Sequence, residues 1–338
     1  YISSNRPVSS CLNIARPAIG ADSLQVAGMS GRNVGVAVID SGTYPHPDVS
    51  GAIDASIDFT GEEAGTTDHL GHGTHVAGII LGRGTMNTAY RGIAPLSRLS
   101  SLKVFGADNV TTLGMILEAM GWVLENARRF NIRVVNLSLG AQAVDSFDVD
   151  PICQATRLLW DQGIVVVASA GNEGNEGRGT VRTPGACPYC LTVGAIDDRR
   201  TQPRNDDVLA SFSSQGPTLD QLTKPDCIAP GVNVVSLRSP GSTLDRQLPL
   251  NRVGEHYFRL SGTSMAAPMV AGLAVLILQR RPDLSPDDVK SILLSTAEDK
   301  GLEAFKQGMG YVNGMLVLRY LPNLQTSWQG NNITVRFS

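Results

Sequence analysis

Three short segments bring together residue types that could perform nucleophilic catalysis. They are residues 36–42 (VAVIDSG), 71–78 (GHGTHVAG) and 261–268 (SGTSMAAP). A serine hydroxyl is a weak nucleophile near neutral pH, so it needs an adjacent base, and the base needs an acid to orient it. Ser264, His72 and Asp40 supply these three groups. Together they predict an acyl transfer reaction in which Ser264 attacks a carbonyl carbon and His72 moves the proton.

Each segment also has a purely structural interpretation when it is taken alone. Asp40 precedes a turn-forming Ser-Gly pair and could close that turn, while Ser264 could be the N-cap of the apolar stretch that follows it. Zinc binding by His72 and His75 is not favoured, because the ligands of a helical zinc motif are four residues apart with an acid between them. We therefore expect His75 to be packed or hydrogen-bonded inside a helix. The nucleophile elbow of the α/β-hydrolases is not matched, because Ala266 replaces its final glycine.

In combination, the three motifs resemble those of the subtilisin-like serine proteases (subtilases, peptidase family S8). This family carries its triad in the chain order Asp, His, Ser, which the present sequence follows. The resemblance covers roughly residues 20–300, and the runs 208–217, 224–231 and 234–240 look most like the AprX-like alkaline protease branch of bacteria. It implies a serine endopeptidase that hydrolyses the peptide bonds of protein or peptide substrates through an acyl-enzyme on Ser264.

The resemblance also implies an oxyanion hole. Residues 164–174 (IVVVASAGNEG) read as an apolar strand that runs into a glycine-rich loop containing Asn172. By similarity to the family, the side-chain amide of Asn172 and the backbone N–H of Ser264 would stabilise the oxyanion of the tetrahedral intermediate. An asparagine between glycines is also common in turns, which is the alternative when this segment is read alone.

Substrates of the family add as a strand between two exposed edges, which is a form of β-augmentation. Carried over to this sequence, the resemblance implies three substrate-binding segments: Asn109, Val110, Thr111 and Leu113; Ser138, Leu139 and Gly140; and Ala168, Ser169, Ala170 and Gly171. The first segment carries bulkier residues than the family pattern. Val110 and Leu113 would shape the S4 pocket, although Leu113 could equally pack in the core.

Arg182 bears on the S1 pocket. Matching residues 183–185 and 193–195 to the family pattern puts Arg182 near the floor of S1, where the family often has glycine. An inward guanidinium would favour acidic P1 residues. We expect the side chain to reach solvent instead, because arginine is rarely buried without a partner.

No cofactor is required for this chemistry, and no metal ligand is assigned. Many subtilases hold calcium in a loop after the His-bearing helix, but residues 81–88 contain no carboxylate, which Ca²⁺ binding requires. The sequence therefore does not support a structural calcium ion there. Several acids precede His72, and we expect them to form a solvated loop rather than a cation site. These acids are Asp54, Asp58, Glu62, Glu63 and Asp68.

Apolar runs alternate with longer periodic segments, which predicts an α/β fold. Strands are expected at 34–39, 99–104, 134–137, 164–168 and 191–193, and helices at 74–81, 113–129, 152–161 and 264–280. Strands that are apolar throughout are covered on both faces. We therefore expect a doubly wound, mostly parallel central sheet with helices on both faces, as in the subtilisin-like fold. Residues 285–288 (SPDD) predict the start of a further helix.

The chain of 338 residues is expected to form one peptidase domain, residues 21–320, between two smaller segments. Residues 1–20 are polar and rich in turn formers, which predicts a surface segment. Residues 321–338 are a C-terminal extension that could add an edge strand at 332–337. A net charge of −3 gives no reason to expect that the protein binds nucleic acid. The sequence contains no run of 18 apolar residues, so no membrane-spanning helix is predicted. A monomer is expected.

The cysteines occupy positions 11, 153, 187, 190 and 227. Cys187 and Cys190 form a C-x-x-C, which could be a redox pair or half of a zinc site. The sequence has no second C-x-x-C and no thioredoxin-like context, so neither function is favoured. Structural disulfide bonds or buried thiols are the preferred interpretation, with pairing left open.

Two other functions would use the same motifs. A non-catalytic scaffold with the subtilase fold should lack a triad member, whereas a peptide ligase or cyclase would pass the same acyl-enzyme to an amine. The resemblance further implies a zymogen whose own N-terminal propeptide is an inhibitor and folding aid. Because the sequence begins at Tyr1, we expect a processed mature end and a secreted, extracellular enzyme, with an intracellular location as the alternative.

Overall fold

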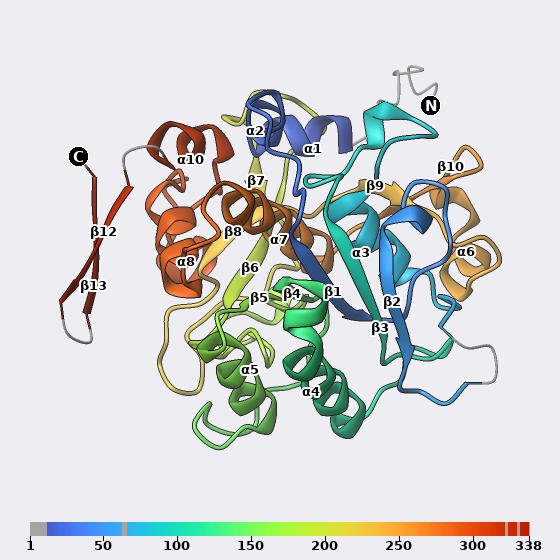
Figure 1. Cartoon of the computed structure of the whole chain (residues 1–338), viewed down its shortest axis with the longest axis horizontal. Coiled ribbons are helices and arrows are strands. Elements are labelled where there is room, and N and C mark those ends of the chain that lie inside the picture. The colour runs from blue at the N-terminus through green and yellow to red at the C-terminus, as the bar shows by residue number, and fades with distance from the viewer. Residues whose placement is uncertain (1–11, 63–65, 322–323, 330–331, 338) are drawn as a thin grey trace.

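The centre of the molecule is a mostly parallel β-sheet (Figure 1). The computed structural model describes residues 12–62, 66–321, 324–329 and 332–337. The strand order is β2-β3-β1-β4-β5-β6-β7, with β8 also pairing with β6, and only the β6–β7 pairing is antiparallel. The strands are β1 (Gly35–Asp40), β2 (Ile53–Asp58), β3 (Arg98–Lys103), β4 (Ile132–Leu137), β5 (Val165–Ser169), β6 (Leu191–Asp197), β7 (Val208–Leu209) and β8 (Cys227–Pro230).

Helices cover both faces of this sheet. Figure 1 shows α4 and α5 on one side, and α3 and α7 on the other. Their bounds are α3 (His72–Leu81), α4 (Leu113–Phe130), α5 (Pro151–Asp161) and α7 (Thr263–Arg280). Strands β1 and β5 are buried along their whole length, which explains their unbroken apolar sequences. The predicted doubly wound α/β fold is confirmed.

The long helix α7 is the core of the molecule. Its side chains from Met265 to Leu278 are buried, because the helix packs against α3 and against strands β4, β5 and β6. Of the helices that the structure describes, α7 is the one that could cross a membrane by length and hydropathy. Here that apolar surface is covered by protein instead. A helix that is apolar all round is expected at such a central position.

The helix that follows α7 begins where the sequence predicts. α8 (Pro286–Ser295) has Ser285 as its N-cap, and Ser285 and Asp288 form a capping box in which each side chain accepts from the other's backbone N–H. The remaining elements are α1 (Leu12–Ala18), α2 (Ala21–Val26), α6 (Thr243–Gln247), α9 (Ala304–Gln307), α10 (Gly314–Tyr320), β9 (Val234–Leu237), β10 (Arg252–Val253), β11 (Tyr257–Leu260), β12 (Leu324–Gln329) and β13 (Asn332–Phe337).

The two ends of the chain differ from expectation in different ways. The predicted N-terminal surface segment is wrong for residues 14–20, because Ala15 and Ile19 are fully buried and the Ile19 carbonyl accepts the Gly314 N–H at 2.7 Å. Residues 1–11 lie outside the described part. At the other end, the strand expected at 332–337 is present as β13, but it pairs with β12 in a two-stranded antiparallel sheet that is separate from the central one.

A small antiparallel sheet, β10-β11-β9, supports the His-bearing helix and was not predicted from the sequence. His75 of α3 is fully buried, and its Nε2 lies 3.1 Å from the carbonyl oxygens of both Val234 and Phe258 in this sheet. Burial, with the nearby His72, lowers the pKa of His75 to about 3, so its imidazole is neutral. The expectation that His75 is hydrogen-bonded in the interior is confirmed.

The cysteines serve structure in the described region. Cys153 of α5 forms a disulfide bond with Cys187, with their Cα atoms 5.5 Å apart. Cys190 and Cys227 are buried free thiols. The redox interpretation of the C-x-x-C is therefore wrong, because Cys187 is bonded to Cys153 rather than to Cys190. Cys11 lies outside the described residues.

Two acids near the end of β6, Asp198 and Asp207, are buried. Burial raises the pKa of Asp198 to about 7 and that of Asp207 to about 6. A carboxyl group whose pKa is raised by folding stabilises the protein at low pH, and that contribution is lost as the pH rises through the folded-state pKa. We therefore expect the free energy of unfolding to fall between about pH 4 and pH 7 on account of these groups.

Replacing Asp207 by Asn should remove its share of this dependence. The variant is expected to be more stable above pH 7 by about 1 to 2 kcal/mol, because the cost of burying the charge is gone. Urea unfolding at pH 4.5 and pH 8 would measure it, in a Ser264→Ala background that prevents self-digestion. The exposed Asp145→Asn variant is the control. An identical pH dependence in Asp207→Asn and its parent would contradict the assignment.

Candidate active site

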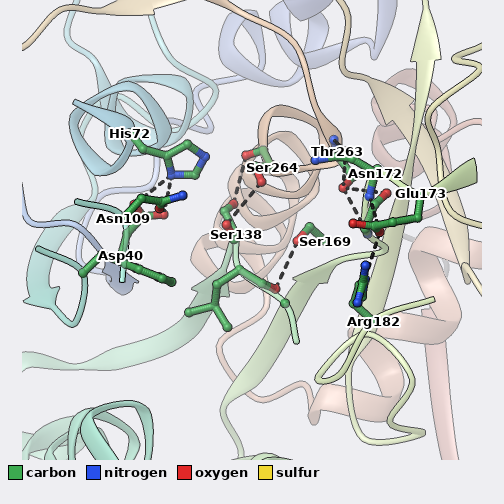
Figure 2. A pocket seen from close by; sticks show the side chains of 14 residues that line it. Asp40, His72, Asn109, Ser138, Ser169, Asn172, Glu173, Arg182, Thr263 and Ser264 are labelled. Carbon is green, nitrogen blue, oxygen red and sulfur yellow. Dashed lines mark hydrogen bonds and ion pairs between the residues drawn. The ribbon is translucent and has the colours of Figure 1, made fainter. Parts of the chain in front are cut away.

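The three residues of the predicted triad lie at one edge of the sheet and line one cavity of about 350 Å³ (Figure 2). Asp40 is the last residue of β1, His72 is the first residue of α3, and Ser264 is the second residue of α7. In open α/β sheets, functional groups gather at the carboxyl ends of the strands. Figure 2 shows Ser264 between His72 on one side and Asn172 on the other.

Asp40 and His72 form a close pair. The Nδ1 atom of His72 lies 2.8 Å from Oδ1 and 3.0 Å from Oδ2 of Asp40, whose side chain is 1% exposed. Burial disfavours the imidazolium, but the charge and hydrogen bond of Asp40 outweigh this, and the pKa of His72 is raised. An Nδ1–H held by the carboxylate leaves Nε2 as the ring atom that can accept a proton.

Ser264 is fixed by reciprocal contacts with Ser138. The Ser264 hydroxyl donates to the Ser138 carbonyl at 3.2 Å, and the Ser138 hydroxyl donates to the Ser264 carbonyl at 2.9 Å. The Ser264 carbonyl is available because Pro268, four residues on, has no N–H to donate to it. Between the described atoms of His72 and Ser264 there is no hydrogen bond, and such contacts often tighten only when substrate binds.

The Asn172 side chain has a defined orientation. Its Oδ1 accepts the Thr263 backbone N–H at 2.9 Å and lies 3.1 Å from the Thr263 hydroxyl. A backbone N–H can only donate, so the oxygen must face Thr263 and the amide nitrogen must face away. Asn172 lines the same cavity as Ser264. The amide N–H groups are thus the part of the side chain that is not bonded to Thr263, and a donor beside the nucleophile is what an oxyanion hole needs.

The predicted substrate-binding residues separate into three groups. Those that line the cavity are Asn109, Ser138, Leu139, Gly140, Ser169 and Gly171. Val110 and Leu113 have exposed side chains, and Thr111 lies between them, so the alternative of core packing for Leu113 is wrong. Ala168 and Ala170 are fully buried and do not line the cavity, and the backbone of Ala170 is hydrogen-bonded to Val193 and Arg182, so their predicted role in substrate binding is wrong.

The cavity also contains residues that the sequence did not single out. They are Phe105, Glu173 and Thr263. Thr263 and Glu173 each adjoin a predicted residue, Ser264 and Asn172, so proximity in the sequence could have indicated them. Phe105 follows strand β3 at the same sheet edge. Its position after a predicted parallel strand could have indicated a place in the site, because the loops that follow parallel strands form such sites.

Arg182 does not extend into solvent as expected. It lines the cavity, and its Nε lies 3.0 Å from Oε2 of Glu173, with both side chains only about a quarter exposed. The Arg182 side chain can lie along the cavity because the residues beneath it, Gly140 and Gly171, have no side chains. A Cβ atom added at Gly140 would lie 2.8 Å from the Arg182 Cβ, and one added at Gly171 would lie 2.7 Å from its Cγ. The aliphatic stem therefore packs on these glycines and brings the guanidinium to Glu173.

The carboxylate of Glu173 is the partner of Arg182 in the ion pair that lines the cavity. Burial favours its neutral form, but Arg182 and the Ser214 hydroxyl outweigh burial and lower the pKa of Glu173. Glu173 also accepts the Asn172 backbone N–H at 2.8 Å. Arg182 and Glu173 also belong to the lining of a second cavity of about 300 Å³. The ion pair therefore forms the partition between the catalytic cavity and this neighbouring one.

The predicted solvated acidic loop before His72 is wrong for several of its members. Asp54 pairs with Arg98, and Glu62 lies 2.7 Å from the Nζ atom of Lys103. Asp68 is buried in hydrogen bonds. Glu63 lies outside the described residues. Within the described residues, no group of three or more His, Cys, Asp or Glu side chains could hold a metal ion.

Comparison with known proteins agrees with this geometry. Residues 31–312 match the model of the subtilase family, Peptidase_S8. The chain is 42% identical to the serine protease AprX of Bacillus subtilis over 318 residues, which cover 91% of this chain and 72% of that protein. It is 36% identical to subtilisin DY of Bacillus licheniformis, covering 88% and 95% of the two chains.

Structural comparison points the same way. The S41 psychrophilic protease matches with a TM-score of 0.70 and 29% identity, over 84% of this chain and 92% of that one. The predicted resemblance to subtilisin-like proteases and to their AprX-like branch is confirmed. Proteins are the substrates of such hydrolases. The chain belongs to the subtilase family of serine endopeptidases.

Proposed function

We propose that Asp40, His72 and Ser264 are the triad through which this enzyme hydrolyses peptide bonds. The observation that carries the proposal is the Asp40–His72 contact at 2.8 Å in the cavity that Ser264 also lines. His72 Nε2 takes the proton of the Ser264 hydroxyl as Oγ attacks the scissile carbonyl, and it then gives that proton to the leaving amine. In the second half of the reaction, His72 takes a proton from water as the water attacks the acyl-enzyme, and His72 then returns a proton to the departing Ser264 oxygen.

Asp40 and Asn172 act on the charges that this reaction creates. Asp40 holds the imidazole in the correct tautomer and stabilises the imidazolium. The Asn172 amide and the Ser264 backbone N–H stabilise the oxyanion of the tetrahedral intermediate. Ser264 lies in the first turn of α7, where backbone N–H groups have no helical partner, so its own N–H is free to donate.

Reaction with a fluorophosphonate probe tests the triad directly. The probe is expected to label Ser264, as located by peptide mapping, and labelling should be lost in His72→Ala. A folded wild type that is not labelled would favour the non-catalytic scaffold. Product masses from a peptide digested in the presence of an added amine would separate a hydrolase from a ligase or cyclase, which joins the amine to the acyl group.

We extend the proposal to how the enzyme is made. A secreted enzyme produced with an N-terminal propeptide, which inhibits it and assists folding, fits the disulfide bond between Cys153 and Cys187. Expression of the full gene with a Ser264→Ala change in a protease-free host tests self-processing. Accumulation of a form that retains the propeptide is expected, whereas removal of the propeptide in this variant would contradict self-processing.

The Arg182–Glu173 pair predicts the P1 preference. Because Glu173 neutralises Arg182, the wild type should cleave better after Phe than after Glu in peptides that differ only at P1. Glu173→Gln leaves the guanidinium without its counter-charge, so the ratio of kcat/KM for Glu over Phe is expected to rise about 5-fold. The double variant Arg182→Ala/Glu173→Gln should lose this gain. A gain that persists without Arg182 would exclude the guanidinium as its source.

A further inference from the structure

A second buried carboxylate lies behind the triad. Asp68 is 1% exposed and accepts four hydrogen bonds from two segments. The donors are the Ser41 hydroxyl (2.8 Å), the Gly71 N–H (2.6 Å), the Thr74 N–H (2.8 Å) and the Thr74 hydroxyl (2.6 Å). Ser41 follows Asp40 directly, while Gly71 and Thr74 flank His72. Asp68 therefore connects the segments that carry the acid and the base.

The direction of these hydrogen bonds is determined by their neighbours. The Ser41 hydroxyl accepts the Gly73 N–H at 2.9 Å, and the Thr74 hydroxyl accepts the Tyr44 N–H at 2.8 Å. Each hydroxyl can therefore direct its own proton to Asp68. Four donors on two oxygens suit a carboxylate and not a carboxylic acid, which would bring a proton of its own. Burial raises the pKa of Asp68, and these hydrogen bonds oppose that shift.

We infer that Asp68 is a positioning residue of the catalytic site, whose carboxylate ties the turn after Asp40 to the start of α3 and so holds the His72 imidazole against Asp40. The inference rests on the proposed triad. A helix cap alone would explain the contacts to Gly71 and Thr74. It does not explain the contact to Ser41, whose hydroxyl also lies 3.2 Å from Oδ1 of Asp40.

The charge of Asp68 also bears on His72. The groups that face His72 are Asp40 at the end of β1, Asp68 in the preceding loop and the neutral His75 one turn later. Lys103 of β3 is paired with Glu62, which also lies 3.8 Å from His69. Asp68 thus adds to Asp40 in favouring the imidazolium. Removing its charge should make His72 easier to deprotonate.

The test is the variant Asp68→Asn, which keeps the shape and removes the charge. We expect kcat to fall about 10-fold with KM nearly unchanged, because the base is displaced by a fraction of an ångström. We also expect the acidic limb of the kcat/KM profile to move to lower pH by about 0.5 or more. Asp288→Asn, which changes a buried capping carboxylate of α8, is the control and should lose stability without moving the limb.

Two further measurements make the outcome decisive. The His72 pKa, read from an NMR titration of the imidazole, should fall in Asp68→Asn. An unchanged value overturns the inference whether or not the wild type hydrolyses peptides, while fluorophosphonate labelling of wild-type Ser264 reports separately on the proposed function. If Asp68→Asn does not fold, Ser41→Ala removes the hydrogen bond from the turn after Asp40 to Asp68, together with the acceptor of the Gly73 N–H. An unchanged kcat in that variant would also overturn the inference.

Discussion

Replacing Ser264 by Ala is expected to lower kcat for peptide hydrolysis by about 10⁶-fold, which is the loss that subtilisin itself shows when its nucleophile is removed. The physical reason is that no acyl-enzyme can form. The Ser138 hydroxyl, which contacts Ser264, donates its proton to the Ser264 carbonyl and has no base beside it to replace the nucleophile. KM should change little, because the substrate-binding edges keep their shape. Single-turnover hydrolysis of a fluorogenic peptide measures the loss.

The members of a catalytic triad act as a unit, so we expect that Asp40, His72 and Ser264 do not contribute additively. His72→Ala is expected to cost about as much as Ser264→Ala, and the double variant should be no slower than either single variant. Pro249→Ala, at an exposed turn that does not line the cavity, serves as a control for purification and folding. A double variant slower than both singles by another factor of 10³ would show that His72 and Ser264 act independently, which would contradict the triad.

The sequence was most informative where function depends on local pattern. Asp40, His72 and Ser264 each follow from a strand end, a glycine turn or a helix start, and each of these signals spans fewer than ten residues. Because parallel strands end at one edge of a sheet, three such segments could be predicted to meet there. The structure places all three around one cavity.

Contacts between distant segments could not be predicted in the same way. Arg182 was expected in solvent, because a sequence does not show which way a long side chain turns when Gly140 and Gly171 leave space beneath it. For Asp68, the sequence predicts a solvated loop because this residue follows other acids. Its burial depends on Ser41 and on Thr74, which belong to separate segments. Tertiary packing decided both positions.

The N-terminal segment illustrates a different limit. Helix α1 has only seven residues, and α2 has six, too few for the periodicity of apolar residues to stand out. Ala15 and Ile19 are nevertheless buried, because α10 packs against α2 and holds this segment by the hydrogen bond between Gly314 and Ile19. A short helix that is stabilised by a distant part of the chain leaves little trace in its own sequence.

Asn172→Ala is expected to lower kcat by about 10²- to 10³-fold with little change in KM, a range known from the corresponding asparagine of subtilisin. The amide meets a full negative charge only when the carbonyl oxygen becomes an oxyanion, so its loss falls on the transition state rather than on ground-state binding. The backbone N–H of Ser264 remains as a second donor, and for this reason the loss should be far smaller than that of Ser264→Ala.

The effect of the Asn172 amide on kcat can be separated from the effect of Thr263, which holds the Asn172 side chain in place. Thr263 holds Asn172 through Oδ1, so Thr263→Val removes the hydroxyl contact but keeps the backbone N–H that also reaches Oδ1. That variant should lose much less kcat than Asn172→Ala. Asn172→Asp replaces the donor by a negative charge at the oxyanion, so it should be at least as slow as Asn172→Ala. A rise in KM without a fall in kcat would assign Asn172 to substrate binding, because only an interaction made in the transition state changes kcat alone.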